Sequence, residues 1–212
     1  GILFLDEFPH YTKNALETMR QPLEDRIITI SRARYNVTLP CSFMLVAAMN
    51  PCPCGYYNDP SHECTCTPAQ VQRYLSRISG PLLDRIDLQV EVVPVPVKEL
   101  TNAPEGEPSA NIRARVVAAR ERQRERFANC PGVHCNAQMS ARQLQELVHL
   151  DEAAQDALSL ALDRLGLSAR AYERVLKVAR TIADLDGSDK VQRQHIAEAV
   201  SYRNLDRSTW GT

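Results

Sequence analysis

The sequence predicts an α/β segment over residues 1–93, a linker over 94–110 and an all-helical domain over 111–212. Two apolar runs in the first segment each end in polar side chains, a pattern typical of buried parallel strands that carry functional groups at their carboxyl ends. Prolines and a glycine between Asn102 and Ser109 mark the linker. Beyond the linker, apolar residues recur at helical spacing, which predicts a small helical bundle.

Turn residues and β-branched runs divide the α/β segment into short elements. In chain order, we expect a strand before Asp6, a helix capped by Thr12 and ended by Pro22, and a hairpin of strands Ile27–Ser31 and Tyr35–Leu39. These are followed by a buried strand Phe43–Met49, a loop Asn50–Thr67, a helix from Thr67 to about Ile78 and a strand Leu88–Val93. The segment Arg32-Ala33-Arg34 gives the hairpin a basic tip.

The all-helical domain begins with a basic helix over residues 111–127, in which positions 113–126 hold six Arg and two Glu. Such a charge run is usually a solvated helix face. Two further helices are capped by Asp151 and Ser168 and end near Gly166 and Gly187, and a last helix carries Ile196, Ala199 and Val200.

The polar residues after the first two apolar runs are the first candidate site. Asp6 and Glu7 follow one run and Asn50 follows the other. Paired carboxylates at the edge of a parallel sheet suit a metal–nucleotide site, in which one holds Mg²⁺ through water and the other polarises the attacking water. The alternative is an ordinary core strand with solvated acids at its end.

Arginines form the second group of candidates. Arg85 follows a short apolar stretch, and a guanidinium there can stabilise the charge that phosphoryl transfer builds on a neighbouring subunit's nucleotide. An intramolecular ion pair of Arg85 with Asp84 or Asp87 is the simpler interpretation. Arg32 and Arg34 suit contacts with DNA phosphates, whereas simple solvation of a hairpin tip explains them equally well.

Four cysteines crowd into one loop, at Cys52, Cys54, Cys64 and Cys66. Four thiolates can form a closed structural Zn²⁺ site, but C-x-C spacing is tighter than is usual for structural zinc. Free thiols and a local disulfide therefore remain alternatives. The odd count of seven cysteines favours metal or free thiols in a reducing compartment, and thus a cytoplasmic protein, over a secreted disulfide framework.

Composition excludes some classes of function. The net charge of −1 provides no overall attraction to nucleic acid, so any such contact must be local. No apolar run approaches the roughly 20 residues of a membrane helix, so no membrane association is expected. The phosphate-binding pattern Gly-x-x-x-x-Gly-Lys-Ser/Thr does not occur. We therefore expect this chain to be the C-terminal part of a longer protein, and we expect this part alone not to hydrolyse ATP.

The segments around these candidates resemble the magnesium-chelatase-like AAA+ proteins of the ComM/YifB type. The matching segments are Ile2–Glu7, Arg20–Asp25, Ile28–Arg34, Ala48–Gly55, Ser79–Asp87, Leu167–Tyr172 and Val178–Ala183. The resemblance implies the second half of an AAA+ P-loop ATPase core, followed by the helical lid. It also implies ATP and Mg²⁺ as cofactors and a homo-oligomeric, hexameric ring.

By this resemblance, Asp6 is the Mg²⁺-associated acid, Glu7 the general base and Asn50 the sensor-1 residue. Arg85 matches the arginine finger, with Arg77 a weaker candidate, and Arg170 matches the sensor-2 residue. The Arg32 and Arg34 hairpin resembles a pore hairpin that contacts single-stranded or branched DNA. The implied activity is ATP-driven branch migration in natural transformation or recombination. The alternatives are a magnesium-chelatase motor subunit and a protein-remodelling ATPase.

Overall fold

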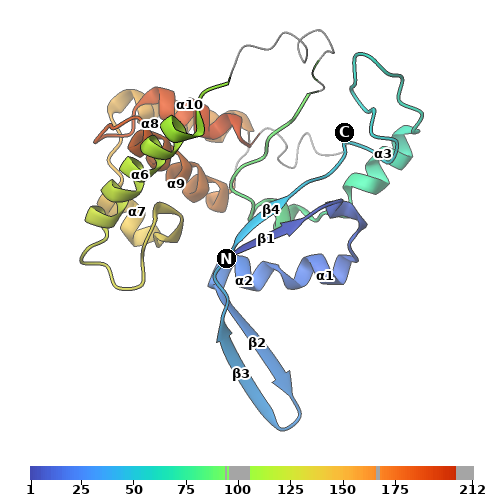
Figure 1. Ribbon diagram of the computed structural model, residues 1–212, viewed down its shortest axis with the longest axis horizontal. Coiled ribbons are helices and arrows are strands. Elements are labelled where there is room, and N and C mark those ends of the chain that lie inside the picture. The colour runs from blue at the N-terminus through green and yellow to red at the C-terminus, as the bar shows by residue number, and fades with distance from the viewer. Residues whose placement is uncertain (94, 96–105, 166–167, 204–212) are drawn as a thin grey trace. The chain divides into compact units, whose positions relative to one another are not determined.

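The computed structural model describes residues 1–93, 95, 106–165 and 168–203 (Figure 1). These residues form two compact units, an α/β unit of residues 1–86, 92 and 93, and a helical unit of residues 87–91, 95, 106–165 and 168–203. Most of the expected linker lies outside the described residues. The helices in the described part of the chain do not include one that is long and apolar enough to cross a membrane.

The α/β unit is built around two parallel strands, β1 (Ile2–Leu5) and β4 (Met44–Ala47), which pair from Ile2 with Met44 to Leu5 with Ala47. Between them lie η1 (Phe8–His10), α1 (Lys13–Thr18), α2 (Arg20–Asp25), β2 (Ile27–Arg32) and β3 (Tyr35–Pro40). α3 (Pro68–Leu75) and α4 (Gly80–Leu83) follow β4. The core of this unit includes Phe8, Leu16, Ile78, Leu82 and Leu83.

Local sequence explains where the helices of this unit begin. The Thr12 hydroxyl accepts the Ala15 N–H and starts α1, and Thr67 and Gln70 form a reciprocal capping box at the start of α3. The expected helix end at Pro22 is wrong. α1 ends at Thr18, and Pro22 lies inside α2, where a residue of the first turn needs no intrahelical N–H bond.

The expected burial of the second apolar strand is also wrong. β4 forms within the expected range, but Met44 is 56% exposed, and Ile2 and Phe4 of β1 are 69% and 59% exposed. Among the described residues the sheet has only these two strands, and only Leu5 and Met49 at its carboxyl edge reach the core of the unit.

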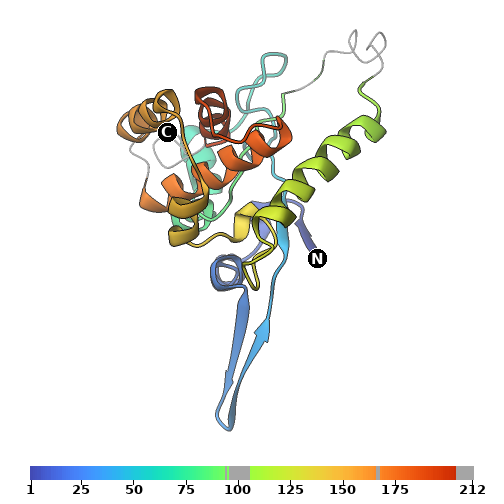
Figure 2. The same cartoon turned by 90° about the vertical axis from the view of Figure 1, so that its left-hand side faces the viewer.

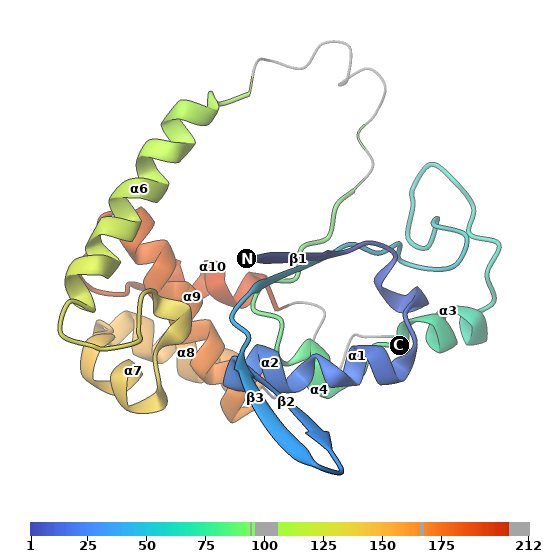
Figure 3. The ribbon, with the colours of Figure 1, turned by 60° about the horizontal axis from the view of Figure 1, so that its bottom comes forward.

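The helical unit comprises α6 (Ser109–Arg126), η2 (Asn136–Gln138), α7 (Ala141–Leu147), α8 (Glu152–Leu165), α9 (Ala169–Leu185) and α10 (Arg193–Ser201) (Figure 3). The predicted caps are confirmed, since Asp151 accepts the Ala154 N–H and Ser168 accepts the Ala171 N–H. The core includes Phe127, Leu158, Val175, Leu176 and Ile196. η2 and α7 are not among the elements expected from the sequence, and the expected helix end near Gly166 lies outside the described residues.

The expected strand Leu88–Val93 is wrong. Residues 88–93 have no regular structure, and residues 87–91 belong to the helical unit. Asp87 pairs with Arg174 of α9, and the Gln89 N–H donates to the Tyr202 carbonyl at 2.8 Å. The backbone of this apolar stretch thus finds a partner at the end of α10 instead of in a neighbouring strand.

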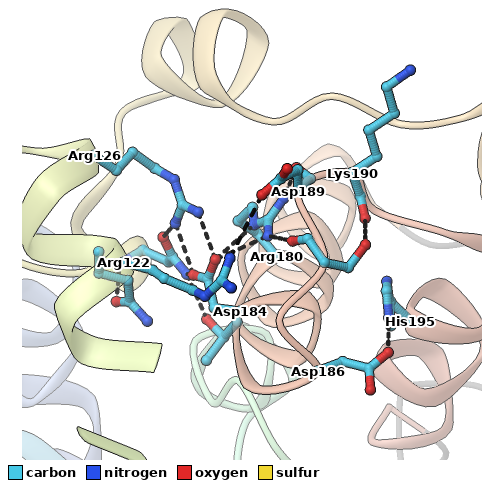
Figure 4. A network of polar contacts seen from close by, with 12 residues as sticks. Arg122, Arg126, Arg180, Asp184, Asp186, Asp189, Lys190 and His195 are labelled. Carbon is cyan, nitrogen blue, oxygen red and sulfur yellow. Dashed lines mark hydrogen bonds and ion pairs between the residues drawn. The ribbon is translucent and has the colours of Figure 1, made fainter. Parts of the chain in front are cut away.

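The basic helix contributes to the interior of the helical unit (Figure 4). Arg126 of α6 donates two hydrogen bonds to the Asp184 carboxylate of α9, at 2.7 and 2.5 Å. Arg180 and Asn136 also bind Asp184, at 2.9 and 2.8 Å. Asp184 is 2% exposed, so one buried carboxylate joins α6, η2 and α9. Arg126 is therefore structural and not part of a solvated face.

Replacement of Asp184 by Asn should destabilise the helical unit by about 3–5 kcal/mol, because it leaves Arg126 and the buried Arg180 without their anion. The measurement is hydrogen exchange of the α6 and α9 amides, which reports the free energy of local opening. Glu146→Gln is the matched control, since Glu146 and Arg142 form an exposed pair with the same i,i+4 spacing. Equal exchange in the two variants would contradict the structural role of Asp184.

The same carboxylate makes the stability of this unit sensitive to acid. Burial alone would raise the pKa of Asp184, but hydrogen bonds from Arg126 and Asn136 and the charge of Arg180 outweigh it and lower the pKa. The stabilisation is therefore complete above the unfolded pKa of about 3.9 and is lost as the pH falls through the lower folded value. The Asp184→Asn variant should lack this part of the acid sensitivity.

Candidate functional site

The parallel pairing of β1 and β4 brings the predicted acids and amide to one edge of the sheet. Leu5 pairs with Ala47, so Asp6 and Glu7 follow β1 on the same side where Met49 and Asn50 follow β4. Two backbone hydrogen bonds fasten this edge, from Ala48 N–H to the Leu5 carbonyl at 2.9 Å and from Phe8 N–H to the Ala48 carbonyl at 3.0 Å. Asp6, Glu7 and Asn50 are all exposed.

Glu7 has an unusual backbone conformation. Its φ of 50° and ψ of 46° lie in the left-handed region, which costs a non-glycine residue about 1–3 kcal/mol; Arg26 and Asn58 share this conformation. The Glu7 N–H donates to its neighbour Asp6 Oδ1 at 2.9 Å, and Glu7 Oε2 lies 3.3 Å from His10 Nδ1. The two carboxylates therefore have different partners: Asp6 accepts the Glu7 N–H, whereas Glu7 lies next to His10.

Three more side chains lie near the acidic edge, and two of them, His10 and Tyr74, are not among the candidates from the sequence. The His10 ring packs edge-on against Tyr74 of α3, with ring centroids 6.0 Å apart. Burial, with the nearby Cys52 and Glu7, raises the pKa of Tyr74. Arg77, the weaker finger candidate, donates to the Pro9 carbonyl at 3.3 Å. Tyr74 lies on the apolar face of α3, a pattern that predicts only a core residue, and no pattern in the sequence distinguishes His10.

Arg85 is held inside the α/β unit. It pairs with Glu24 of α2 at 2.5 Å and donates to the Pro81 carbonyl at 2.6 Å, and its side chain is 8% exposed. The partner is therefore neither Asp84 nor Asp87, the two acids nearest in sequence. In this conformation the guanidinium is not presented at the surface.

Arg170 lies in the helical unit, as the second residue of α9 after the Ser168 cap, and it is exposed. It therefore lies near the positive end of the α9 helix dipole, the end of a helix at which anions are favoured.

The predicted basic hairpin is confirmed. β2 and β3 pair antiparallel from Ile27 with Pro40 to Arg32 with Tyr35, leaving Ala33 and Arg34 as the turn. Every residue from Ile28 to Pro40 is exposed, and the hairpin extends away from the other elements of its unit (Figure 2). Arg32 and Arg34 thus lie together at the far end of an isolated two-stranded ribbon.

The four cysteines of the loop between β4 and α3 come together. Cys52 Sγ lies 3.3 Å from Cys54 Sγ and 3.7 Å from Cys64 Sγ, and all four sulfur atoms, including that of Cys66, lie within 4.8 Å of one another. It is the one such group of potential metal ligands that the described residues contain. Cys130, His134 and Cys135 also lie close together in the sequence, but they do not form a comparable cluster.

The thiols of this cluster differ in acidity. A hydrogen bond from the Tyr56 backbone lowers the pKa of Cys54 to about 5. For Cys64, a backbone hydrogen bond from Cys66 is outweighed by burial and by the neighbouring thiols, which raise the pKa to about 12. Burial and the same neighbours raise the pKa of Cys66. Four sulfur donors at these separations are consistent with a tetrahedral metal site.

Comparison with known proteins gives matches along almost the whole chain. The family model described as magnesium chelatase, subunit ChlI, matches residues 1–100, and the model described as magnesium chelatase, subunit ChlI C-terminal, matches residues 106–203. Uncharacterized protein YifB is 47% identical over 211 residues in Escherichia coli K12 and 46% identical over 210 residues in Salmonella typhimurium LT2. Competence protein ComM of Haemophilus influenzae is 45% identical over 208 residues. Each alignment covers 98% of this chain, which spans 40% of the length of each relative.

Proposed function

Because the chain belongs to the magnesium chelatase ChlI family, an ATPase family, we propose that it is part of a ring-shaped motor that remodels DNA with the energy of ATP hydrolysis. The observation that carries the DNA part of the proposal is the exposed hairpin with Arg32 and Arg34 at its tip. Two guanidinium groups on an isolated ribbon suit sequence-independent phosphate contacts. The similarity to a competence protein supports DNA as the substrate.

The acidic edge is the proposed site of ATP hydrolysis. Carboxylate and amide oxygens are donors that suit Mg²⁺, and the exposed carboxylates of Asp6 and Glu7 lie at the strand edge where α/β sheets bind ligands. In this proposal, Asp6 would hold Mg²⁺, which when bound would supply charge neutralisation at the phosphates. Glu7 would take the proton of the attacking water, and Asn50 would orient that water. The different partners of the two carboxylates, the Glu7 N–H for Asp6 and His10 for Glu7, support this division of roles.

Two further arginines have proposed roles in a hexameric ring. Arg170, in the first turn of α9, would contact bound nucleotide from the helical unit, which acts as the lid of the ATPase. Arg85 would reach the nucleotide of a neighbouring subunit as the arginine finger. For that role the Arg85 guanidinium must leave Glu24 and bind the phosphate. In this proposal, the pair with Glu24 is the position of Arg85 when no nucleotide faces it.

The hairpin is tested by the double replacement Arg32→Ala/Arg34→Ala in the full-length protein. Affinity for DNA of any sequence should fall, because phosphate contacts carry no base information. The slope of log affinity against log salt should flatten by about 0.7–0.9 for each phosphate that the variant no longer binds. Fluorescence anisotropy with labelled branched and single-stranded DNA over a salt series measures both effects.

Arg124→Ala/Arg142→Ala is the matched control, since it removes the same two charges from exposed positions of the helical unit. It should leave both the affinity and the slope near the wild-type values. If the hairpin variant forms intact rings and binds DNA with unchanged affinity and slope, the hairpin does not bind the DNA.

A magnesium-chelatase motor subunit is the second candidate function, favoured by the description of the two family models. Such a motor acts on a partner protein and a porphyrin, and a protein-remodelling ATPase also acts on a protein partner. Neither requires a basic hairpin that binds phosphate. Weaker, less salt-dependent DNA binding by the hairpin variant therefore distinguishes the first proposal from both alternatives.

A further inference from the structure

The four-cysteine cluster has the dimensions of a filled tetrahedral metal site. A tetrahedron with Zn–S bonds of about 2.3 Å has S···S edges of about 3.8 Å. The Cys52–Cys54, Cys54–Cys64 and Cys52–Cys64 sulfur pairs are 3.3, 3.5 and 3.7 Å apart, and no pair in the cluster exceeds 4.8 Å. A single ion can therefore bond Cys52, Cys54 and Cys64 after shifts of a few tenths of an ångström, and Cys66 after a shift of about 1 Å at most.

The two alternatives left open by the sequence fit this geometry less well. A disulfide requires an S–S distance of about 2.05 Å and would pair the sulfur atoms two by two. Here Cys52, Cys54 and Cys64 are nearly equidistant, with no preferred pair. Free thiols have no reason to converge from both ends of a loop, because their mutual hydrogen bonds are weak.

The loop that holds the two cysteine pairs runs from the end of β4, next to Asn50 of the proposed ATP site, to the start of α3 (Figure 3). Cys52 lies two residues after Asn50, and Cys66 immediately precedes Thr67, the cap of α3. Cys52 is 0% exposed and packs with Val71, Tyr74 and Leu75 of α3. An ion held by both pairs would close residues 52–66 into a loop with a fixed base.

We propose that Cys52, Cys54, Cys64 and Cys66 bind one Zn²⁺ as a closed structural site that fixes the segment after β4 against the start of α3. Four thiolates complete the tetrahedron and leave no position for water or substrate, so the ion has no catalytic role. Its effect is to position the backbone around Asn50 and, through α3, Tyr74, which contacts His10 at the acidic edge. This inference does not depend on DNA as the substrate of the motor.

Metal analysis of the full-length protein, purified under reducing conditions without chelators, tests the site directly. We expect about one zinc per chain, as a single four-cysteine site requires, and X-ray absorption should show four sulfur neighbours at about 2.3 Å. Cys54→Ala/Cys64→Ala should lose the zinc. Cys41→Ser should retain it, because Cys41 is a half-buried thiol of the same unit outside the cluster.

Wild-type protein alone keeps the test decisive if the double variant fails to fold. Substitution with Co²⁺ should give the visible absorption of a tetrahedral four-thiolate complex, and added Zn²⁺ should remove it. Protein that contains no metal, or iron in place of zinc, would overturn the assignment. So would zinc retained at full stoichiometry by folded Cys54→Ala/Cys64→Ala protein.

The positioning role has a separate measurement. Removal of zinc with a chelator should raise hydrogen exchange in residues 50–75, because metal-binding energy is coupled to local folding. Exchange in the hairpin, residues 27–40, should not change, and added zinc should restore the original pattern. If zinc is bound but its removal leaves exchange in residues 50–75 unchanged, the ion does not position this segment.

Discussion

Replacement of Arg85 by Ala is expected to lower ATP hydrolysis by the full-length ring by about 10³–10⁵-fold, the range associated with an arginine finger. The physical reason is the loss of a guanidinium that stabilises charge on the transferred phosphoryl group of the neighbouring subunit. ATP binding should remain, because in this role Arg85 acts in the transition state. Steady-state turnover and nucleotide binding, measured on the same preparation, separate the two effects.

The buried pair with Glu24 requires controls for a structural role of Arg85. Arg85→Lys keeps the charge next to Glu24 but loses the planar fork, so it should fold normally and hydrolyse ATP slowly. Glu24→Gln weakens the resting pair without removing the guanidinium, and it should retain most of the activity. If Glu24→Gln is as inactive as Arg85→Ala and unfolds as easily, the pair stabilises the fold and Arg85 is not the finger.

Action across a subunit interface has a sharper test. Arg85→Ala subunits retain Glu7, and Glu7→Gln subunits retain Arg85. Rings that mix the two variants contain some interfaces at which an intact Glu7 faces an intact Arg85, and they should recover part of the activity. Stable mixed rings that remain inactive would contradict action in trans.

Replacement of Glu7 by Gln should slow ATP turnover by about 10²–10⁴-fold, the usual contribution of a positioned proton-transfer group. ATP and Mg²⁺ should still bind, since Asp6 and the backbone of the edge are unchanged. Single-turnover measurement of ATP hydrolysis isolates this step from product release.

The contacts of Glu7 supply a control for this prediction. His10→Gln removes the side chain that lies 3.3 Å from Glu7 Oε2, yet leaves the carboxylate in place, so its effect should be much smaller. Near-normal turnover in Glu7→Gln would show that another group accepts the proton. A similar loss in both variants would assign the effect to the arrangement of the edge and not to the carboxylate.

Local chemistry in the sequence predicts much of the fold. The side-chain caps at Thr12, Thr67, Asp151 and Ser168 each depend on a few neighbouring residues, and all four are confirmed. The β2–β3 hairpin is also local, since its strands are joined by a two-residue turn. The strand expected at 88–93 is wrong. Its apolar residues are typical of a strand, but the backbone N–H of Gln89 binds the Tyr202 carbonyl instead of a neighbouring strand.

The site was predictable where it depends on strand direction. Asp6, Glu7 and Asn50 share an edge because β1 and β4 are parallel, and the apolar runs before them indicated that arrangement. Partners remote in sequence were not predictable from spacing. Arg85 binds Glu24 instead of an adjacent acid, and Arg126 binds Asp184 across 58 positions. The left-handed residue Glu7 lies between two backbone hydrogen bonds that join the strand ends, an arrangement that no pattern in the sequence indicates.

The central claim, that this chain belongs to a motor whose ATP hydrolysis acts on DNA through the hairpin, is tested most directly by ATP turnover with and without branched DNA. The full-length ring should hydrolyse ATP faster when DNA is added. The Arg32→Ala/Arg34→Ala ring should keep its basal rate, because neither arginine is placed at the nucleotide, and it should lose most of the stimulation. A wild-type rate that DNA does not change, or equal stimulation of both rings, would contradict the claim.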